Sequence, residues 1–202
     1  MVDKIYKIAI TGKANTGKNT VSKLIAKHLS VQVGGAWNIQ NIAFADPIKE
    51  MVRQMFPKLP KKSLYGPSSF RASPIPGAFK NGVPLTIRQL LIDLGTGVGR
   101  EYKENLWLDV FDDTFEKAVN KGKAAVIVTD CRFRNEFDHL KTLGFYHIRL
   151  LRDSYTKINH SSETNQDSII DAEFDAIIDN NGTLKDLKKR ISEIMIHLEI
   201  SA

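Results

Sequence analysis

The chain has 202 residues, of which 42% are apolar and 26% are charged. That length and balance predict one sizeable hydrophobic core, so we expect a single domain spanning residues 1–202 and exclude a disulfide-stapled mini-protein. Lysine and arginine (29) exceed aspartate and glutamate (23), which gives a formal net charge of +6. This modest excess permits a phosphate-bearing partner but falls short of the clustered charge of a nucleic-acid-binding arm.

Cysteine usage and hydropathy narrow the class of protein further. Cys131 is the only cysteine, which excludes an intrachain disulfide and a multi-cysteine zinc site and is typical of a reducing compartment. The N-terminal segment has no secretory signal pattern, and no stretch approaches the ~18 consecutive apolar residues of a membrane helix. We therefore expect a soluble cytoplasmic protein with no membrane partner.

Short β-branched runs alternate with stretches of helical period, a pattern typical of parallel α/β sheets. In chain order, the expected strands are residues 5–10, 39–45, 124–129, 145–151 and 176–178. Apolar residues recur at intervals of three and four in segments 21–25, 87–94, 107–118 and 184–198, which predicts helices with one face toward the core. The fold class that follows is α/β, with a parallel sheet of about five strands.

Two segments interrupt this alternation. Six of the seven prolines fall in residues 57–84, among five lysines and arginines, and we expect no regular helix there. A connection of this length is a functional loop, a lid or an insertion, or else a solvated excursion without a role. Residues 153–172 are rich in Ser, Thr, Asn and Asp and predict a second, lid-like loop.

A phosphate-binding loop is predicted between the first strand and the first helix. Its glycines let backbone N–H groups point at phosphate oxygens, and the helix N-terminus adds a favourable dipole. The residues that we expect to hold ATP are Gly12, Asn15, Thr16, Gly17, Lys18, Asn19 and Thr20. Lys18 would reach the β- and γ-phosphates, and the form Lys-x-Thr is typical of small-molecule kinases such as adenylate kinase. A chance glycine-rich turn is the alternative, and the strand before and helix after argue against it.

Charged residues near expected strand and helix ends suggest a second phosphate site, because ligands of open α/β sheets bind there. Lys49 lies in the first turn of a helix for which we expect Asp46 as the N-cap, a start that needs no functional explanation. Arg88 and Arg100 flank a glycine-rich turn beginning where Gly95 is expected to end a helix. Such a pair of arginines suits a phosphate monoester.

Asp130 ends an expected buried strand, at a place where P-loop proteins hold magnesium or substrate. Arg132 would neutralise a transferred phosphoryl group, and Glu136 would receive a sugar hydroxyl or orient an arginine. An ion-pair network without catalytic role is the alternative. No metal-ligand spacing occurs, so the only metal expected is the Mg²⁺ that accompanies a nucleotide, with Thr20 and Asp130 as candidate contacts through water.

Arg149 and Arg152 bracket the end of the fourth expected strand, just before the lid-like loop that contains His160 and Glu163. Basic residues beside a lid suit phosphoryl transfer, in which catalysis is mainly positioning and charge neutralisation. We therefore expect Lys18, Arg132 and Arg152 to be the catalytic residues.

The motifs occur in the order Gly-x4-Gly-Lys-x-Thr, Phe-Ala-Asp-Pro-x-Lys, Arg-x2-Leu-x3-Gly-Thr with a following Trp, Thr-Asp-x-Arg-x3-Glu, and His-x2-Glu. In this the whole chain resembles bacteriophage deoxynucleoside monophosphate kinases. The resemblance implies a three-layer P-loop kinase fold and transfer of the γ-phosphoryl group of ATP, with Mg²⁺, to a deoxynucleoside 5′-monophosphate. It also suggests a homodimer, in the host cytoplasm if the chain is viral.

The resemblance also implies which residues contact each substrate. Residues 12–20 would hold ATP. With Arg100 added from the arginine pair, the deoxynucleotide site comprises Lys49, Arg88, Gly95, Thr96, Arg100, Trp107, Asp130, Arg132 and Glu136; Trp107 is equally suited to the core. Asn19 stands where relatives often have Asp, and Ile92 where Gln is common. Residues 57–84 fall where relatives carry a variable insertion near the acceptor.

Two rival functions remain open from the residues. Another small-molecule P-loop kinase, such as a dephospho-coenzyme A kinase, would share the loop, but the 88–96 and 130–136 segments argue against it. A P-loop ATPase coupled to nucleic acid would use the +6 charge. Because the basic residues fall in motifs expected to face one cleft, we expect small-molecule substrates and no stable nucleic-acid binding.

Overall fold

The computed structural model describes residues 5–153 and 165–201. The chain divides into two compact units. The first, here called the sheet unit, comprises Met1–Ala43 and Phe111–Ala202, and the second, the inserted unit, comprises Phe44–Val110. Each has its own cluster of buried apolar side chains. The single domain expected for residues 1–202 stays a prediction, and the 57–84 segment lies within the inserted unit.

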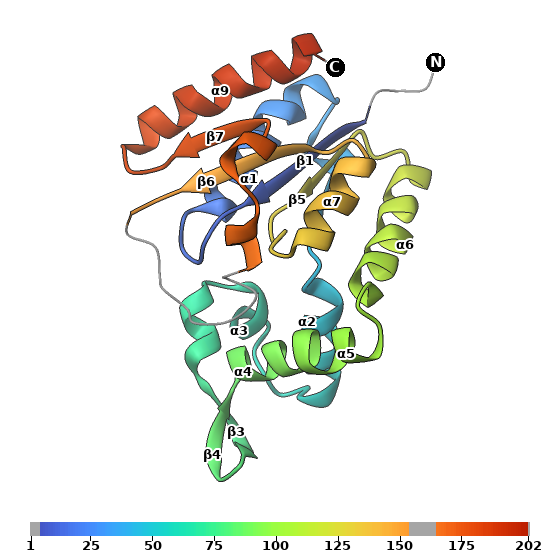
Figure 1. The fold of residues 1–202 in the computed structure, drawn as a ribbon, viewed down its shortest axis with the longest axis vertical. Helices are drawn as coiled ribbons and strands as arrows, with labels where there is room; N and C mark the ends of the chain where they lie inside the picture. The colour runs from blue at the N-terminus through green and yellow to red at the C-terminus, as the bar shows by residue number, and fades with distance from the viewer. Residues whose placement is uncertain (1–4, 154–164, 202) are drawn as a thin grey trace. The chain divides into compact units, whose positions relative to one another are not determined.

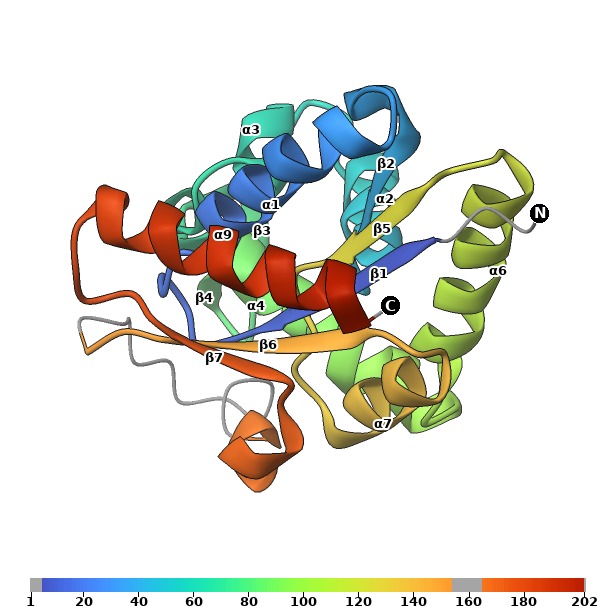
Figure 2. The same ribbon diagram turned by 90° about the horizontal axis from the view of Figure 1, so that it is seen from above.

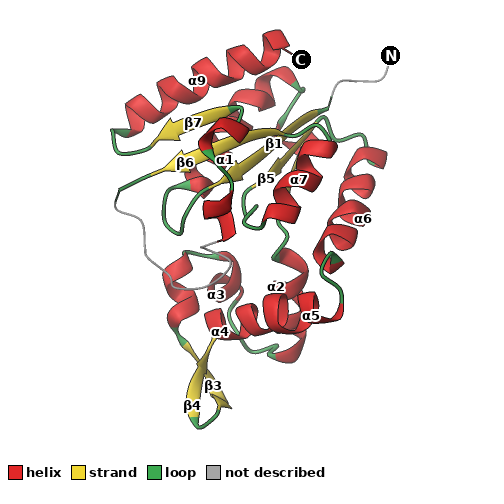
Figure 3. Ribbon diagram, in the orientation of Figure 1, coloured by secondary structure: helices red, strands yellow, loops and turns green. Residues whose placement is uncertain are grey.

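The sheet unit is built on five parallel strands in the order β2-β5-β1-β6-β7. Figures 1 and 3 label β1, β5, β6 and β7, and Figure 2 also labels β2. They are β1 (Tyr6–Thr11), β2 (Ile39–Ile42), β5 (Ala125–Val128), β6 (Tyr146–Leu151) and β7 (Ala176–Asp179). The predicted α/β class with about five parallel strands is confirmed. The largest difference is in the second strand, which ends at Ile42 and not at residue 45.

Helices cover both faces of this sheet and make three layers. In Figure 2, α1 (Lys18–Gln32) and α9 (Leu184–Ser201) lie on one side of the strands and α7 (Arg134–Thr142) lies on the other. The 111–120 part of α6 (Leu106–Asn120) lies beside α7, where His139 Nε2 and Asp112 Oδ1 are 2.6 Å apart. The apolar periodicity of the sequence predicts α1, α6 and α9, because one face of each helix packs toward the core. It did not predict α7.

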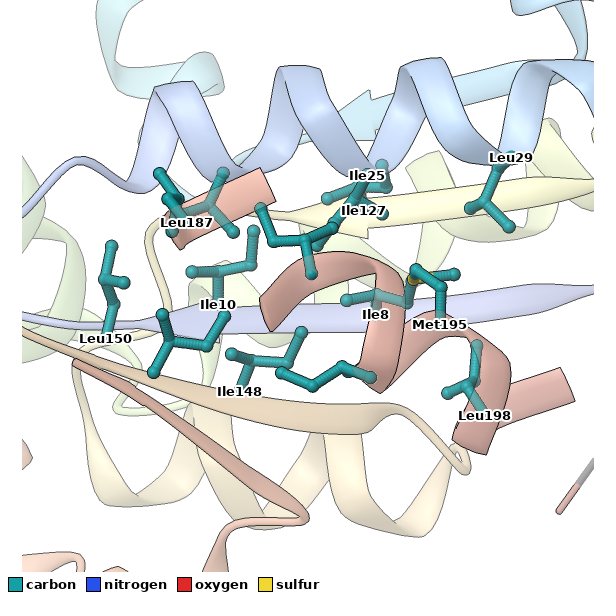
Figure 4. Close-up of a cluster of buried hydrophobic side chains, with 14 of the residues drawn as sticks. Ile8, Ile10, Ile25, Leu29, Ile127, Ile148, Leu150, Leu187, Met195 and Leu198 are labelled. Atoms are coloured by element: carbon teal, nitrogen blue, oxygen red, sulfur yellow. The ribbon is translucent and has the colours of Figure 1, made fainter. Parts of the chain in front are cut away.

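The core between the sheet and the α1/α9 layer surrounds the central strand. Ile8 and Ile10 of β1 are completely buried. Their neighbours in this cluster include Ile25, Leu29, Ile127, Ile148, Leu150, Leu187, Met195 and Leu198 (Figure 4). Burying one such side chain stabilises the fold by roughly 1.5–3 kcal/mol relative to leaving it exposed. The sheet unit is therefore held together chiefly around β1.

A histidine is buried on β6, toward α7. The His147 side chain is inaccessible to solvent, and its ring centroid lies 4.2 Å from that of Phe137. Neither ring nitrogen has a hydrogen-bond partner among the described residues. Burial lowers the pKa of His147 from 6.5 to about 4, against the opposing effect of the Asp175 carboxylate. The folded chain therefore keeps this ring neutral.

The inserted unit contains more regular structure than its prolines suggest. Its elements are α2 (Asp46–Met55), α3 (Lys61–Tyr65), a 3₁₀ helix (Ser68–Ala72), β3 (Pro74–Lys80), β4 (Val83–Thr86), α4 (Ile87–Ile92), a π-helix (Asp93–Gly99) and α5 (Arg100–Tyr102). Expecting no helix in 57–84 was wrong for α3, because Pro60 and Pro67 lie outside its two ends. The unit's small core comprises Val52, Leu64, Ile75, Ile87 and Leu90.

The two strands of the inserted unit form an antiparallel hairpin. Lys80 pairs with Val83, which leaves Asn81 and Gly82 as a two-residue turn. Both turn residues have left-handed backbone, with φ of 53° and 79°. A type I′ turn requires this conformation at both positions, and asparagine followed by glycine is its preferred sequence.

Among the described residues, no helix combines the length and apolar character needed to cross a bilayer.

The buried His147 makes stability depend on pH. The unfolded ring titrates near 6.5 and the folded ring at about 4, so the unfolded state binds more protons between these values. Stability is therefore lost as pH falls from 6.5 through 4, by at most about 3 kcal/mol. Urea unfolding of His147→Leu between pH 7 and pH 4.5 should show a flatter pH dependence than the wild type.

The matched control is His197→Gln, because the His197 side chain is exposed on α9. This variant should keep the wild-type slope. If the two variants showed the same pH dependence as the wild type, burial of His147 would not be the cause.

Candidate functional site

The predicted phosphate-binding loop lies between β1 and α1, and two of its glycines are required by geometry. A Cβ on Gly12 would lie 2.6 Å from the carbonyl oxygen of Leu150, closer than packed atoms approach. Gly17 has a φ of 105°, in the left-handed region, where a side chain is strained. The loop conformation therefore explains why glycine stands at both positions.

The rest of the loop turns tightly into the helix. Thr16 is buried, and its hydroxyl donates to the carbonyl oxygen of Lys13 at 2.9 Å. Asn15 has a φ of 63°, which asparagine tolerates better than most residues. Asn19 and Thr20 are exposed in the first turn of α1. This turn contains no acidic residue, and no described side chain caps it, so its positive end is suited to an anion.

Lys18 folds back over the loop. Its Nζ donates to the carbonyl oxygens of Gly12 at 2.6 Å and Lys13 at 2.7 Å. Burial and, to a lesser extent, the Arg132 charge lower its pKa from 10.5 to about 7, against the opposing effect of the Asp130 carboxylate. A lysine with such a low pKa needs an anion beside it to hold its proton firmly, so the loop is prepared for a negatively charged ligand.

Asp130 and Arg132 follow β5, the strand next to β1 in the sheet. The register pairs Ala9 with Val128, so both strands end at the same edge. Ligands of open parallel sheets bind outside this carboxyl edge. The structure thus places Asp130 and Arg132 near enough to Lys18 to affect its pKa.

Glu136 makes local hydrogen bonds to the backbone at the start of α7. Its side chain is 3% exposed, and its Oε2 accepts hydrogen bonds from the backbone N–H groups of Arg132 at 2.7 Å and Phe133 at 3.1 Å. The carboxylate therefore fixes the backbone of Arg132 and Phe133 at the start of α7. Its predicted contact with the acceptor stays a prediction.

At the end of β6, Arg149 ties down the chain that follows the predicted lid. Its Nη1 donates to the carbonyl oxygen of Ile169 at 2.7 Å and lies 2.8 Å from Asp171 Oδ1. Arg149 is therefore structural, whereas Arg152 is exposed just after the strand, and its predicted catalytic role stays a prediction. Residues 154–164, with His160 and Glu163, lie outside the described residues.

Two short 3₁₀ helices, Asn165–Ser168 and Asp171–Glu173, follow residue 164 in the chain. Asp167 in the first of them pairs with Lys13 of the phosphate-binding loop at 2.5 Å. The end of the predicted 153–172 lid is thus attached to the loop by an ion pair.

In the inserted unit, Lys49 is held between an acid and an aromatic ring. Its Nζ lies 2.7 Å from Asp46 Oδ1 and 5.2 Å from the ring centroid of Tyr65. Asp46 was expected to cap α2, but it is the first helical residue and Ala45 is the cap. The carboxylate of Asp46 instead pairs with Lys49 one turn later.

Arg88 and Arg100 lie on α4 and α5, on either side of the π-helix. Arg88 Nη2 donates to the carbonyl oxygen of Ser68 at 3.0 Å, and Arg100 Nη1 donates to that of Glu104 at 3.3 Å. Each contact uses part of a guanidinium group that carries five N–H donors. Both arginines are half-buried.

The expectation that Gly95 ends its helix was wrong. The helix continues as the π-helix Asp93–Gly99, and neither Gly95 nor Gly99 has a positive φ. Glycine is needed there for close packing: a Cβ on Gly99 would lie 2.4 Å from Trp107 Cζ2, and one on Gly95 would lie 2.8 Å from Ile48 Cδ1. Trp107 is 6% exposed, and its Nε1 donates to the Gly95 carbonyl oxygen at 2.7 Å. Trp107 therefore belongs to the core, as the alternative interpretation held.

This packing predicts different effects of the same substitution at Gly99 and Gly97. Gly99→Ala should destabilise the chain by about 1–3 kcal/mol because the new methyl group overlaps the Trp107 ring. Gly97→Ala meets no atom within 4 Å and should leave stability unchanged or raise it by up to about 1 kcal/mol. Thermal unfolding of both variants tests this, and equal melting temperatures would contradict it.

Two contact residues were missed from the sequence. Tyr65 contacts Lys49, and Asn180 contacts the phosphate-binding loop through the carbonyl oxygen of Thr16. Asn180 comes directly after β7, so the rule that ligands bind at carboxyl ends of parallel strands could have identified it. Tyr65 lies in the proline-rich segment, where no comparable rule applies.

The described residues do not form a metal site of their own. The described residues contain no group of three His, Cys, Asp or Glu side chains that could hold a metal ion. Thr20 and Asp130 supply a hydroxyl and a carboxylate from the sheet unit. These oxygen groups suit Mg²⁺ that arrives with phosphate ligands of its own.

Comparisons with known proteins add independent findings. The model of the deoxynucleotide monophosphate kinase family matches residues 71–191. A protein of Acanthamoeba polyphaga mimivirus, provisionally named deoxynucleotide monophosphate kinase, is 26% identical over 194 residues, which are 91% of this chain and 93% of the viral protein. The structure of dephospho-CoA kinase from Campylobacter jejuni is similar with a TM-score of 0.49 and 14% identity, over 95% of this chain and 96% of that one.

Proposed function

We propose, from the premise that the chain belongs to the deoxynucleotide monophosphate kinase family, that it transfers the γ-phosphoryl group of ATP to the 5′-phosphate of a deoxynucleoside monophosphate. Family membership makes the chain a nucleotide kinase. The observation that carries the finer proposal is the loop at residues 12–20. It lies outside the matched segment 71–191, so its phosphate-binding geometry supports the proposal independently.

ATP is the substrate that suits this loop. The first turn of α1 presents its amides and positive dipole end to the phosphates. Lys18 would exchange the carbonyl oxygens of Gly12 and Lys13 for β- and γ-phosphate oxygens. Because anions favour the charged amine, this exchange stabilises both the lysine charge and the nucleotide.

Transfer of a phosphoryl group needs positioning and charge neutralisation more than covalent chemistry. Arg132, whose backbone Glu136 fixes, lies near Lys18 and would offset charge on the group in transfer. Bound Mg²⁺ would neutralise charge on the β- and γ-phosphates, with Thr20 and Asp130 as its candidate contacts through water. No residue needs to act as a strong base, because the attacking oxygen is already a phosphate oxygen.

The acceptor is assigned to residues of the matched segment and of α2. Lys49, Arg88 and Arg100 are the cations that would bind its 5′-phosphate, and Arg88 and Arg100 lie within residues 71–191. Their fixed backbone contacts and the Asp46 pairing of Lys49 hold their side chains in place. The homodimer and the absence of stable nucleic-acid binding stay predictions.

A coupled assay of ADP formation with each of the four deoxynucleoside monophosphates tests the proposed function. We expect acceptor-dependent ADP and a diphosphate product, and the preferred base will emerge from the same measurement. Lys18→Ala should lower kcat/KM by about 10³-fold or more, because it removes charge stabilisation in the transition state. Its circular dichroism spectrum should stay that of the wild type.

Other outcomes of this assay point elsewhere. DNA-stimulated ATP hydrolysis without an acceptor would identify a nucleic-acid-coupled ATPase, and phosphorylation of dephospho-coenzyme A alone would identify that kinase activity. Near-normal activity of Lys18→Ala would show that Lys18 and its loop do not take part in phosphoryl transfer.

The low pKa of Lys18 predicts that ATP binding takes up a proton. At pH 8 the free lysine, with a pKa of about 7, is mostly neutral, and bound phosphates should raise its pKa well above 8. Uptake should approach one proton per ATP, measured by calorimetry in two buffers of different ionisation enthalpy. Lys18→Arg should show no such uptake because arginine stays charged. Equal uptake by both proteins would contradict the low pKa.

A further inference from the structure

Asn180 occupies a fixed position at the end of the edge strand β7. Its backbone N–H donates to the carbonyl oxygen of Leu151 at 2.9 Å, which anchors it beside the end of β6. Its side-chain Nδ2 donates to the carbonyl oxygen of Thr16 at 2.8 Å. The two bonded residues are 164 positions apart in the sequence, so the fold as a whole creates this contact.

Gly17 leaves room for this side chain. A Cβ built on Gly17 would lie 2.6 Å from Asn180 Nδ2, so the amide group occupies the space that a side chain at position 17 would need. Asn180 therefore packs directly against the peptide unit between Thr16 and Gly17 and also bonds to its oxygen.

The hydrogen bond fixes the orientation of this peptide unit. In a trans peptide the carbonyl and the N–H point in opposite directions, so holding the Thr16 oxygen toward Asn180 directs the Gly17 N–H away from it. Glycine alone permits many orientations. The bond from Asn180 selects one of them before any ligand arrives, which lowers the entropy lost on binding.

We propose that Asn180 is a positioning residue that holds the phosphate-binding loop in its ATP-binding conformation. The inference rests on the proposed function only in taking ATP as the ligand of this loop. Asn180 acts through the loop and belongs to the sheet unit, as do Thr16 and Gly17. Its loss should therefore weaken ATP binding and leave the acceptor unaffected.

Asn181 provides a matched control at the adjacent position. Its Oδ1 accepts a hydrogen bond from the backbone N–H of Asp153 at 2.9 Å, a role that a carboxylate keeps. Asn181→Asp thus adds the same negative charge one residue away without removing a donor from the loop. Asn180→Asp removes the donor and keeps the size of the side chain.

Calorimetric titration of ATP without an acceptor measures the effect directly. We expect Asn180→Ala to raise the Kd for ATP about tenfold, the effect of one lost hydrogen bond. Asn180→Asp should raise it on the order of fiftyfold, because its carboxylate also repels the Thr16 oxygen. Asn181→Asp should stay within about threefold of the wild type, as expected for an exposed charge.

Steady-state kinetics separate positioning from a general structural role. In Asn180→Ala the KM for ATP should rise while the KM for the deoxynucleotide stays within about twofold, since the bond touches only the ATP loop. A merely structural asparagine would lower the melting temperature and leave the Kd for ATP unchanged. If Asn180→Ala does not fold, the comparison of Asn180→Asp with Asn181→Asp decides.

Three results would overturn the inference: a Kd for ATP within about twofold of the wild type in Asn180→Ala, equal effects of the two aspartate variants, or equal loss of affinity for both substrates. Failure of the proposed function is distinguishable. A wild-type chain that binds ATP but phosphorylates no deoxynucleotide disproves the proposed reaction, and the Kd ratios still test Asn180. If the wild-type chain binds no ATP, both the proposed function and the role of Asn180 are disproved.

Discussion

Burial of the central strand β1 is the constraint on which the phosphate-binding loop depends. Ile8 and Ile10 are inaccessible to solvent between the sheet and the α1/α9 layer, and neighbouring strands pair with β1 on both sides. The strand therefore has no freedom to shift its register. Gly12 follows at once, against the Leu150 carbonyl oxygen of β6, so the loop inherits a fixed starting point from the core.

The charged side chains near this loop are held by backbone contacts that an anionic ligand could replace. Lys18 donates to two loop carbonyl oxygens, and burial and Arg132 destabilise its charged form. The Glu136 carboxylate accepts hydrogen bonds from the backbone N–H groups of Arg132 and Phe133 at the start of α7. The two cations at the carboxyl edge are thus positioned by backbone contacts at some cost in charge repulsion, which an anionic ligand would offset.

The sequence predicts the sheet unit better than the inserted unit for a physical reason. The spacing of apolar residues in strands and helices is set by burial on one face or both, so the five parallel strands could be predicted. The Lys18 loop could be predicted because its glycines and lysine form a local motif. The contact between Asn180 and Thr16 joins residues 164 positions apart and leaves no local pattern, so only the place of Asn180 after an expected strand could have indicated it. In the inserted unit the density of prolines led to the wrong expectation that no helix forms where α3 lies. The pair Asn81 and Gly82 is a local signal for a hairpin that was not used. The helix end expected at Gly95 was wrong because glycine serves close packing there.

The contact between Gly99 and Trp107 has a consequence for how such sequences can diverge. The indole ring of Trp107 fills the volume that a side chain at position 99 would occupy, so the sizes of the side chains at positions 99 and 107 are coupled. A larger residue at 99 requires a smaller one at 107, and the hydrogen bond from the indole to the Gly95 oxygen is then lost as well. Drift at these sites must therefore proceed through paired changes, and the glycine-rich helix and its tryptophan will tend to be inherited together.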